Sequence, residues 1–141
     1  MQKYFSACSE MNLLHVIADI NQSTYQRSDL CPPSELVQVA IIPLTDGKYL
    51  KPHKHSVKMH SDLIKQATQE CWLVYRGSLY VRLYDESDAL IHEQLLQSGQ
   101  ILITFKGGHA FECMEPNTIL IEFKNGPYSG AKGIPIGLTD C

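Results

Sequence analysis

The spacing of apolar residues changes near residue 36. Beyond it, short apolar runs are separated by glycine, proline, asparagine and aspartate, which are typical of turns. Over 79–84, apolar and polar side chains alternate, as in a strand with one buried face. Strands this short and this regularly spaced favour an all-β antiparallel sandwich or barrel. The runs that predict strands are 36–42, 49–55, 71–75, 79–84, 89–96, 101–105, 109–115 and 118–124.

The first 35 residues follow a different pattern. Leu13 and Ile17 lie at helical spacing. A Cys-Pro-Pro run over 31–33 then interrupts any regular element. We therefore expect a lead-in over 1–35, either a short helix or an irregular segment, followed by a single β-barrel domain over 36–141.

Two connections stand out between the predicted strands. Acidic and serine residues at 85–88 join 79–84 to 89–96, so these two strands are expected to form a hairpin. The stretch 56–69 is mostly polar and predicts a long surface loop. Long ordered loops in compact domains are often functional.

Composition narrows the class of partner. The chain has 141 residues, enough for one domain with its own core, and its formal charge of −3 leaves no electrostatic footprint for nucleic acid. No run of like charge indicates a membrane surface, and no apolar run approaches the roughly 20 residues of a membrane span. The five cysteines form no CxxC pair, which indicates reduced thiols. With no secretory signal in the sequence, we expect a cytoplasmic protein.

Three histidines and one glutamate carry the strongest chemical signal. His53 and His55 are two positions apart in a predicted strand, so their side chains point to one face while Lys54 points away. Glu70 and His109 stand at the starts of two other predicted strands. In a rolled sheet these four side chains can converge on one ion.

The types of residue in this set decide what they can bind. Neutral imidazole binds Zn, Fe, Ni, Mn and Cu, and one carboxylate adds charge compensation. No cysteine belongs to the set, which disfavours a purely structural zinc site. Four protein ligands leave positions open on an octahedral ion for water or substrate. We expect one divalent transition metal ion (Fe, Mn, Ni or Zn) and a small-molecule ligand; the alternative is ordinary histidines at the surface or the core edge.

Five further residues are candidates for catalysis or substrate binding. Glu122 and Lys124 share one face of the last strand, where they act as acid and base in a barrel mouth or form a surface ion pair on an exposed edge strand. His60, in the polar stretch, is a second catalytic candidate, or a solvated loop histidine. Tyr128 is expected at the barrel rim, where it hydrogen-bonds a ligand or packs. Arg82 lies on a stripe that lines a sugar pocket, forms a subunit contact or faces solvent.

The spacing of these residues resembles the first motif of the cupin superfamily. That motif reads G-x5-H-x-H-x3,4-E-x6-G, and the chain has Gly47, His53, His55, Glu70 and Gly77. The intervals from Gly47 to His53 and from Glu70 to Gly77 match the motif. Between His55 and Glu70, however, fourteen residues stand in place of three or four.

The second motif and a narrower resemblance add to this. The second motif reads G-x5-P-x-G-x2-H-x3-N; Gly99 and His109 align with it, but the interval is one residue short, the proline is absent and Cys113 replaces the asparagine. Pro-His-Lys-His at 52–55 and Glu-Phe-Lys-Asn-Gly-Pro-Tyr at 122–128 resemble small cupin-fold metalloproteins related to the WbuC type. Members of that branch are associated with gene clusters for surface polysaccharides.

The resemblance implies a cupin-type double-stranded β-helix, or jelly-roll barrel, with a metal on His53, His55, Glu70 and His109. It also implies a homodimer and, by context, sugar metabolism. Three functions follow as hypotheses. The first is a metal-dependent isomerase or epimerase acting on a sugar or sugar nucleotide in polysaccharide biosynthesis. The others are an iron-dependent dioxygenase and a non-catalytic module that binds a sugar or a metal.

Overall fold

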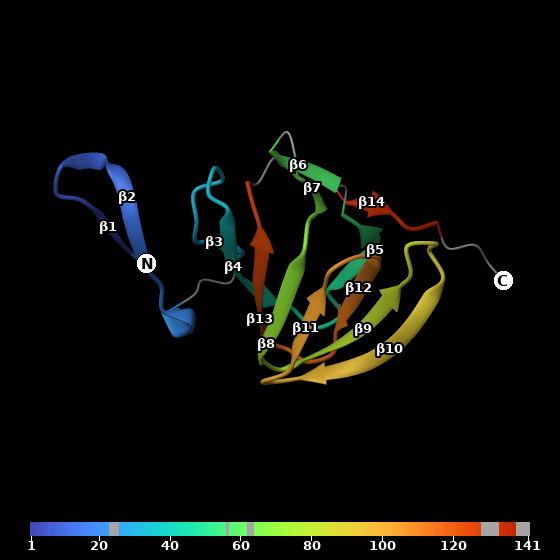
Figure 1. The fold of residues 1–141 in the computed structure, drawn as a ribbon. Coiled ribbons are helices and arrows are strands. Elements are labelled where there is room, and N and C mark those ends of the chain that lie inside the picture. The colour runs from blue at the N-terminus through green and yellow to red at the C-terminus, as the bar shows by residue number, and fades with distance from the viewer. Residues whose placement is uncertain (23–25, 56, 62–63, 128–132, 138–141) are drawn as a thin grey trace.

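The centre of the molecule is a barrel made of two antiparallel five-stranded sheets (Figure 1). The computed structural model describes residues 1–22, 26–55, 57–61, 64–127 and 133–137, without the side chains of 9–11, 57–61 and 64–67.

The first sheet carries His53 and His109 and leads directly into His55, and we call it the histidine sheet. Its strand order is β10–β9–β12–β5–β14. The bounds are β5 (Tyr49–Lys54), β9 (Ser78–Tyr84), β10 (Leu90–Gln97), β12 (Gly108–Cys113) and β14 (Ile134–Pro135).

The second sheet carries Glu70 and Glu122, and we call it the glutamate sheet. Its order is β11–β8–β13–β4–β3. The bounds are β3 (Ser28–Asp29), β4 (Val37–Leu44), β8 (Glu70–Arg76), β11 (Ile101–Thr104) and β13 (Thr118–Asn125).

Each of the predicted strands is present, with ends that differ by at most two residues. The predicted hairpin is confirmed, since β9 pairs antiparallel with β10. The all-β prediction is therefore confirmed. Within the described residues, no helix is long and apolar enough to span a lipid bilayer.

The interior between the two sheets is apolar through most of its depth. Fully burying a large apolar side chain contributes about 1.5–3 kcal/mol, so this cluster is the main source of the barrel's stability. Its buried members are Leu44, Trp72, Val74, Leu79, Val81, Leu96, Phe111, Cys113 and Leu120.

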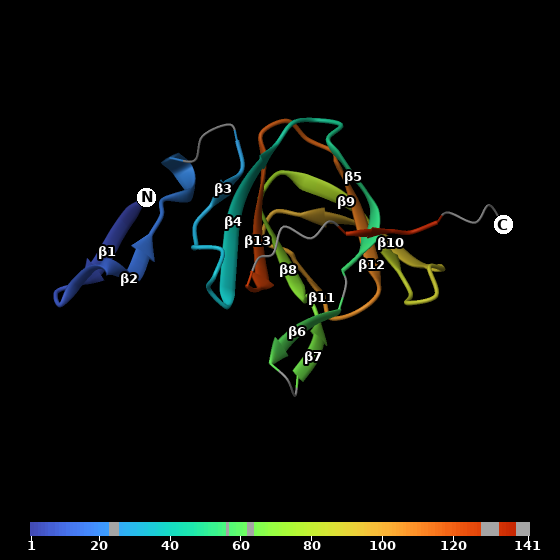
Figure 2. The same cartoon turned by 90° about the horizontal axis from the view of Figure 1, so that it is seen from above.

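The lead-in forms a β-hairpin, so the expectation of a short helix or an irregular segment is wrong. β1 (Gln2–Ser6) pairs antiparallel with β2 (Ser9–Ile17), and a short 3-10 helix, η1 (Ile20–Gln22), follows. Leu13 and Ile17 are four residues apart, and that interval places two side chains on one face of a strand as well as of a helix. The hairpin stands away from the barrel in both views (Figures 1 and 2).

The predicted long loop over 56–69 is also wrong. β6 (Val57–Ser61) and β7 (Ile64–Ala67) pair as a second small hairpin, which projects from the barrel between β5 and β8 (Figure 2). Only Val57 and Met59 alternate with polar residues in the first of these strands. That short pattern was outweighed by the polar composition of the whole stretch.

Candidate metal centre

A bulge in β5 allows both core packing and a metal ligand on the same strand. Between the pairs His109↔His53 and Phe111↔Leu50, β5 advances three residues while β12 advances two. The extra residue reverses the alternation of side chains. Leu50 therefore packs against the core while His53 also points into the barrel.

His55 follows the last residue of β5 and lies on the same side as His53. Their ring centroids are 5.0 Å apart. Lys54, between them, points away as expected: its Nζ donates to the backbone carbonyl of Glu86 (3.0 Å) and pairs with Asp88. The odd-even alternation of a strand thus separates the histidines from the intervening charge.

His109 enters from the neighbouring strand β12 and is only 1% exposed. Its ring centroid lies 4.8 Å from that of His53 and 5.2 Å from that of His55. The preceding residue, Gly108, leaves room for Ile136, because a Cβ there would stand 2.1 Å from Ile136 Cδ1. The three imidazoles thus meet at one end of the barrel interior.

Glu70 reaches the same point from the opposite sheet. It is the first residue of β8, and its carboxylate is buried. Its Oε2 lies 3.2 Å from His55 Nε2 and 3.4 Å from His109 Nε2. The structure therefore brings together all four residues that the sequence singled out.

The donor atoms of His55, His109 and Glu70 are spaced as ligands of one divalent transition metal ion are. The ligand atoms of His53, His55 and His109 lie within 4.8 Å of one another, and the two Nε2 atoms of His55 and His109 are 3.3 Å apart. Ligands at about 2.1 Å from one ion are about 3.0 Å apart in octahedral and about 3.4 Å apart in tetrahedral geometry. The distances among His55, His109 and Glu70 fall in or near this range.

Hydrogen bonds on the far side of two rings orient them for such a role. His53 Nδ1 lies 2.9 Å from the carbonyl oxygen of Lys51, and His109 Nδ1 lies 3.0 Å from Thr104 Oγ1. The carbonyl only accepts, so His53 Nδ1 carries the proton and the lone pair of its Nε2 is directed inward. A proton on His109 Nδ1, donated to Thr104 Oγ1, gives His109 the same tautomer. Such partners fix both the tautomer and the ring orientation of histidine ligands.

The protonation states also favour a cation. Burial alone would raise the pKa of Glu70, but the hydrogen bond from His55 and the charges of His55, His109 and Lys124 outweigh it and lower the pKa to about 2. Burial lowers the pKa of His109 to about 3, because the opposing effect of the Glu70 charge is smaller. A carboxylate and a neutral imidazole are the forms that ligate metals.

Trp72 closes the inner side of the centre. Its ring centroid lies 4.4 Å from that of His109, and it is 2% exposed. Phe111 packs edge-on against it at 5.2 Å. This aromatic floor separates the polar end of the barrel from the core and keeps water from the buried side of His109.

A line of charged side chains leads from the centre to the solvent. Lys124 Nζ lies 3.8 Å from Glu70 Oε1 and 3.0 Å from Glu122 Oε1. Arg27 Nη2 donates to the same Glu122 oxygen at 2.7 Å, and Arg27 Nε donates to Asp29 at 2.9 Å. Glu122 is 8% exposed on β13, an inner strand of the glutamate sheet. The alternative of an ion pair on an exposed edge strand is therefore wrong.

A cavity of about 150 Å³ opens beside this line of charges. Charged side chains line part of its wall, and apolar atoms supply the larger share of the lining surface. The lining residues are Arg27, Asp29, Cys31, Pro33, Gln38, Val39, Glu122 and Lys124. It offers polar contacts to a small ligand at the barrel mouth.

The other predicted site residues are placed less favourably. Arg82 pairs across the strands with Ala110, next to His109, so it lies on the outer face of the histidine sheet. There it donates to Glu93 (2.8 Å) and stacks on Tyr80, and the structure does not bring it to the histidines. The side chain of His60, on β6, and the whole of Tyr128 lie outside the described residues.

Three residues of the centre were not predicted from the sequence. Arg27 belongs to the lead-in, where nothing in its neighbourhood marks it as part of the barrel. Thr104 differs from other strand threonines only in its place opposite Glu70. Gly133 lies against the His53 ring, where a Cβ would be 2.3 Å from Cδ2. The only sequence pattern that suggests this contact is a glycine in a segment that pairs with a strand carrying histidines, and this pattern is weak.

The chain matches no protein-family model and no curated protein. Solved structures resemble it in fold. KdgF from Halomonas sp. has a TM-score of 0.58 at 14% identity, over 74% of this chain and 80% of that one. A cupin superfamily protein from Desulfitobacterium hafniense has a TM-score of 0.53 at 14% identity, over 79% and 84%.

The capsular polysaccharide assembling protein CapF from Staphylococcus aureus has a TM-score of 0.55 at 18% identity; the match covers 70% of this chain and 26% of CapF. Identities this low show the fold alone. The chain has the cupin fold, in agreement with the resemblance of its histidine motif.

Proposed function

We propose that this protein binds one divalent transition metal ion through His53, His55, Glu70 and His109, and that it isomerises or epimerises a sugar or sugar derivative. The observation that carries the proposal is the convergence of three imidazoles and one carboxylate from two sheets, at ligand spacing, beside a charged cavity. Three imidazoles and one carboxylate suit Fe, Mn, Ni and Zn.

The residues of the mouth suggest how a proton would move. A bound divalent ion would supply Lewis acidity at a carbonyl oxygen of the substrate. Among the described residues, Glu122 is a carboxylate beside the ligand set; it takes a proton from the carbon next to that carbonyl and returns it to the neighbouring carbon, which isomerises the substrate. Epimerisation needs a second proton carrier on the opposite face of that carbon. Lys124 and Arg27 both bond Glu122 Oε1 and hold the carboxylate in place.

The cavity supports a polyhydroxylated substrate. Arg27 and Lys124 supply N–H donors, while Asp29 and Glu122 supply acceptors, and hydroxyl groups both donate and accept. The fold likeness to CapF, a capsular polysaccharide assembling protein, and the resemblance to the WbuC type support a role in surface polysaccharide metabolism. Tyr128 remains a proposed contact at the rim, and His60 a proposed second proton carrier.

We place this activity in the cytoplasm. The described cysteines Cys8, Cys31, Cys71 and Cys113 are all free thiols, and thiols persist in a reducing compartment.

Element analysis of the untagged protein tests the metal site. We expect about one transition metal ion per chain in the wild type and none in His53→Ala with His109→Ala. Lys54→Ala is the matched control, because its side chain lies between the two ligands and points away; it should keep the ion. A wild type that takes up no ion from any of the four metals contradicts the proposal.

Solvent exchange tests the chemistry. Metal-loaded protein is incubated in D₂O with a panel of sugars, sugar acids and sugar nucleotides, and deuterium uptake is followed by mass spectrometry. Uptake by one compound, lost in Glu122→Gln although the ion is retained, is the expected result. Binding without exchange would indicate a non-catalytic module, and oxygen consumption by the ferrous protein would indicate a dioxygenase.

A further inference from the structure

The charged cavity at the barrel mouth is smaller than an ordinary ligand site. It measures about 150 Å³, whereas sites for small organic ligands measure about 300–1,000 Å³. Arg27, Asp29, Glu122 and Lys124 supply the charged part of its wall. A ligand of ordinary size that places its polar part here therefore extends beyond the cavity.

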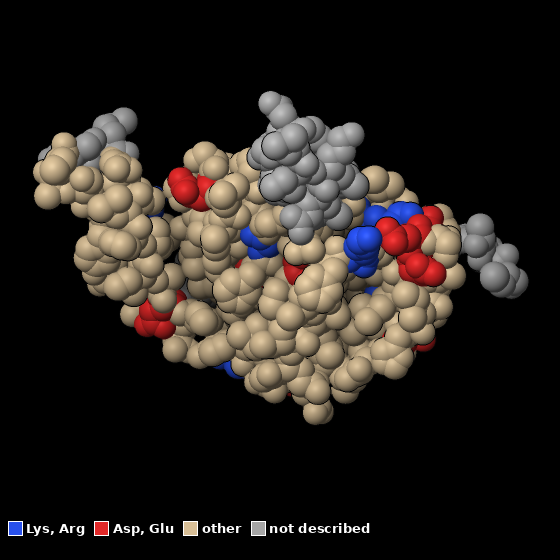
Figure 3. All heavy atoms as spheres, viewed as in Figure 1, with Lys and Arg blue, Asp and Glu red and all other residues tan. Residues whose placement is uncertain are grey.

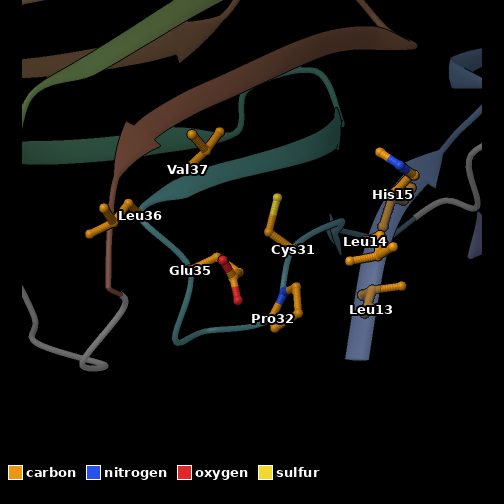
Figure 4. Close-up of a pocket in the computed structure, with 9 residues that line it drawn as sticks. Leu13, Leu14, His15, Cys31, Pro32, Glu35, Leu36 and Val37 are labelled. Carbon is orange, nitrogen blue, oxygen red and sulfur yellow. The ribbon is translucent and has the colours of Figure 1, made fainter. Parts of the chain in front are cut away.

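A second hollow adjoins the cavity at Cys31. It is a groove of about 400 Å³ between β2 and the segment that leads into β4 (Figure 4). Cys31 lines both the groove and the cavity, and of the two prolines that follow, Pro32 lines the groove and Pro33 lines the cavity. The two spaces thus lie on either side of one short turn, and together they reach the usual volume of a small-molecule site.

The groove differs from the cavity in its charged side chains. Leu13 and Leu14 line the β2 side of the groove, and Leu36 and Val37 line its barrel side (Figure 4). None of the described lining residues is a lysine or an arginine, and one, Glu35, is a carboxylate. The groove therefore offers no cation to the phosphates of a sugar nucleotide, and the charge of Glu35 repels them.

The apolar side chains of the groove are open to solvent. Leu14 is 52% exposed, Leu36 is 67% exposed and Val37 is 66% exposed. Removing apolar surface from water is favourable in proportion to the area that is buried. An alkyl or aryl group in the groove would gain this free energy from both of its walls.

The turn between the two spaces is held in place by hydrogen bonds. Gln38, which is 8% exposed and lines the cavity, donates from Nε2 to the carbonyl oxygens of Pro32 (2.9 Å) and Glu35 (2.8 Å). The backbone N–H of Gly126 donates to the carbonyl oxygen of Leu36 at 2.6 Å. Both spaces are therefore preformed, so a ligand that occupies them has little chain to order.

We propose that the groove binds the apolar aglycone of a glycoside whose sugar occupies the charged cavity. The substrate is then an amphiphilic glycoside with an alkyl or aryl group, not a sugar nucleotide. The inference rests on that part of the proposed function which places a sugar in the cavity. The β1–β2 hairpin, which stands away from the barrel, becomes one wall of the substrate site through Leu13 and Leu14.

The outer face of the glutamate sheet, away from the barrel interior, is a competing apolar surface. Ile101 and Ile103 on β11 are 56% and 53% exposed, and few charged side chains lie on the surface over β8 and β11 (Figure 3). The described lining of the cavity and the groove includes no residue of β11. An apolar group bound on that face gains nothing from a sugar in the cavity, and this difference separates the two sites.

Calorimetric titration with alkyl glycosides tests the groove. The probes are methyl, hexyl and octyl glycosides of glucose, galactose, mannose and glucuronic acid, below the concentrations at which they form micelles, and octanol. Complete burial of one methylene strengthens binding up to about fourfold. Because the groove is open, we expect a smaller gain per methylene, with an octyl glycoside at least about tenfold tighter than the methyl glycoside of the same sugar.

Two leucine variants locate the gain. Leu36→Glu places a charge in the groove and should remove the dependence on chain length, while metal uptake and circular dichroism stay as in the wild type. Leu90→Glu is the matched control, since Leu90 is 51% exposed on β10 of the histidine sheet; it should keep the full gain. A control that loses the gain as Leu36→Glu does overturns the proposal.

The outcomes separate this proposal from the proposed function. Equal affinity for methyl and octyl glycosides in the wild type overturns the amphiphilic substrate and leaves the metal site and the proton transfer as proposed. Octanol that binds as tightly as every octyl glycoside also overturns it, because the apolar site is then unconnected with a sugar. Tighter binding of octyl glycosides without deuterium exchange supports the amphiphilic ligand and removes the isomerase.

Photolabelling shows where the alkyl chain lies. An octyl glycoside with a diazirine at the end of its chain should label residues 13–16 or 31–37 of the wild type, and should label them less in Leu36→Glu. Label concentrated on 101–105 would place the chain on the outer face of the glutamate sheet and contradict the proposal. So would an unlabelled groove together with a change in assembly mass in Leu36→Glu, because a second copy of the chain then covers the groove.

Discussion

The two ends of the barrel interior are made by the same strands from opposite kinds of side chain. β8 places Glu70 at the mouth and Val74 in the core, and β13 places Lys124 at the mouth and Leu120 in the core. All four side chains point inward. Alternation along a strand therefore decides the direction of a side chain, while the position along the strand decides whether the interior there is polar.

The free energy of burying side chains also differs between the two ends. Burying the apolar end stabilises the fold, whereas burying charged groups costs several kcal/mol per ion unless partners offset it. At the mouth, Glu70, Lys124, Glu122 and Arg27 offset that cost by pairing with one another. Because apolar residues would stabilise the same space at least as well, the polar end is best explained by binding and chemistry.

Removing one ligand should have the largest effect and should be confined to the mouth. His109→Gln keeps the side chain's volume roughly but takes away one of four donors. Structural Zn²⁺ sites bind with about 10–16 kcal/mol, so the loss of one donor in four should weaken metal binding by about 3–4 kcal/mol, several hundredfold. Competition with a chromogenic chelator measures this. An affinity within threefold of the wild type would remove His109 from the ligand set.

A substitution at the apolar end should have the opposite effect: it should lower stability and leave metal binding intact. Leu120 is 0% exposed in the core, and Leu120→Ala should lower the free energy of unfolding by about 2–5 kcal/mol. The metal affinity of the folded protein should stay close to that of the wild type. Urea unfolding in chelator, followed by metal titration of the folded variant, separates the two effects. A large loss of affinity would show that the two ends are not independent.

The same comparison explains what the sequence could predict. The inward direction of His53, His55 and His109 follows from strand parity, and these predictions were possible because apolar residues such as Phe111 share the inward face of their strand. The bulge in β5 was invisible, because both Leu50 and His53 look ordinary in a strand pattern. Contacts set by the closing of the barrel leave even less trace in the sequence.

Arg27 illustrates that second limit. It lies 95 positions from Glu122 along the chain, and only the pairing of β3 with β4 places the two together. The outward direction of Arg82 could not be predicted for a related reason. The sequence shows which side chains of β9 share a face with Arg82, but it does not show which face of the sheet the barrel encloses. The lead-in hairpin was missed because a four-residue interval is common to helices and strands.

Acid should destabilise the metal-free protein through two groups at the mouth. The pKa of His109 is lowered to about 3 and that of Glu70 to about 2. The unfolded chain therefore binds more protons than the folded chain, between about 6.5 and 3 for the histidine and between about 4.5 and 2 for the glutamate. Stability is thus present above these windows and is lost as the pH falls through them.

Each group contributes at most about 1.4 kcal/mol per pH unit within its window, or about 5 °C in Tm for a chain of this length. Thermal unfolding in chelator from pH 7 to pH 4 measures the slope. His109→Gln should flatten the part of the curve between pH 6.5 and 4.5, while Leu120→Ala should lower the whole curve in parallel. A slope in His109→Gln equal to that of the wild type would assign the acid sensitivity to other groups.

The smallest effect on metal affinity should come from removing a hydrogen-bond partner of one of the ligands. Thr104→Val removes the Oγ1 that lies 3.0 Å from His109 Nδ1 while keeping the size and branching of the side chain. Loss of such a partner typically lowers metal affinity by about 10–100-fold, and the low end applies here because Trp72 also holds the ring at 4.4 Å. Thr104→Ser keeps the hydroxyl and should restore most of the affinity. If valine binds the ion as tightly as threonine, then packing against Trp72 orients His109, and the boundary between the polar and apolar ends is itself what builds the metal centre.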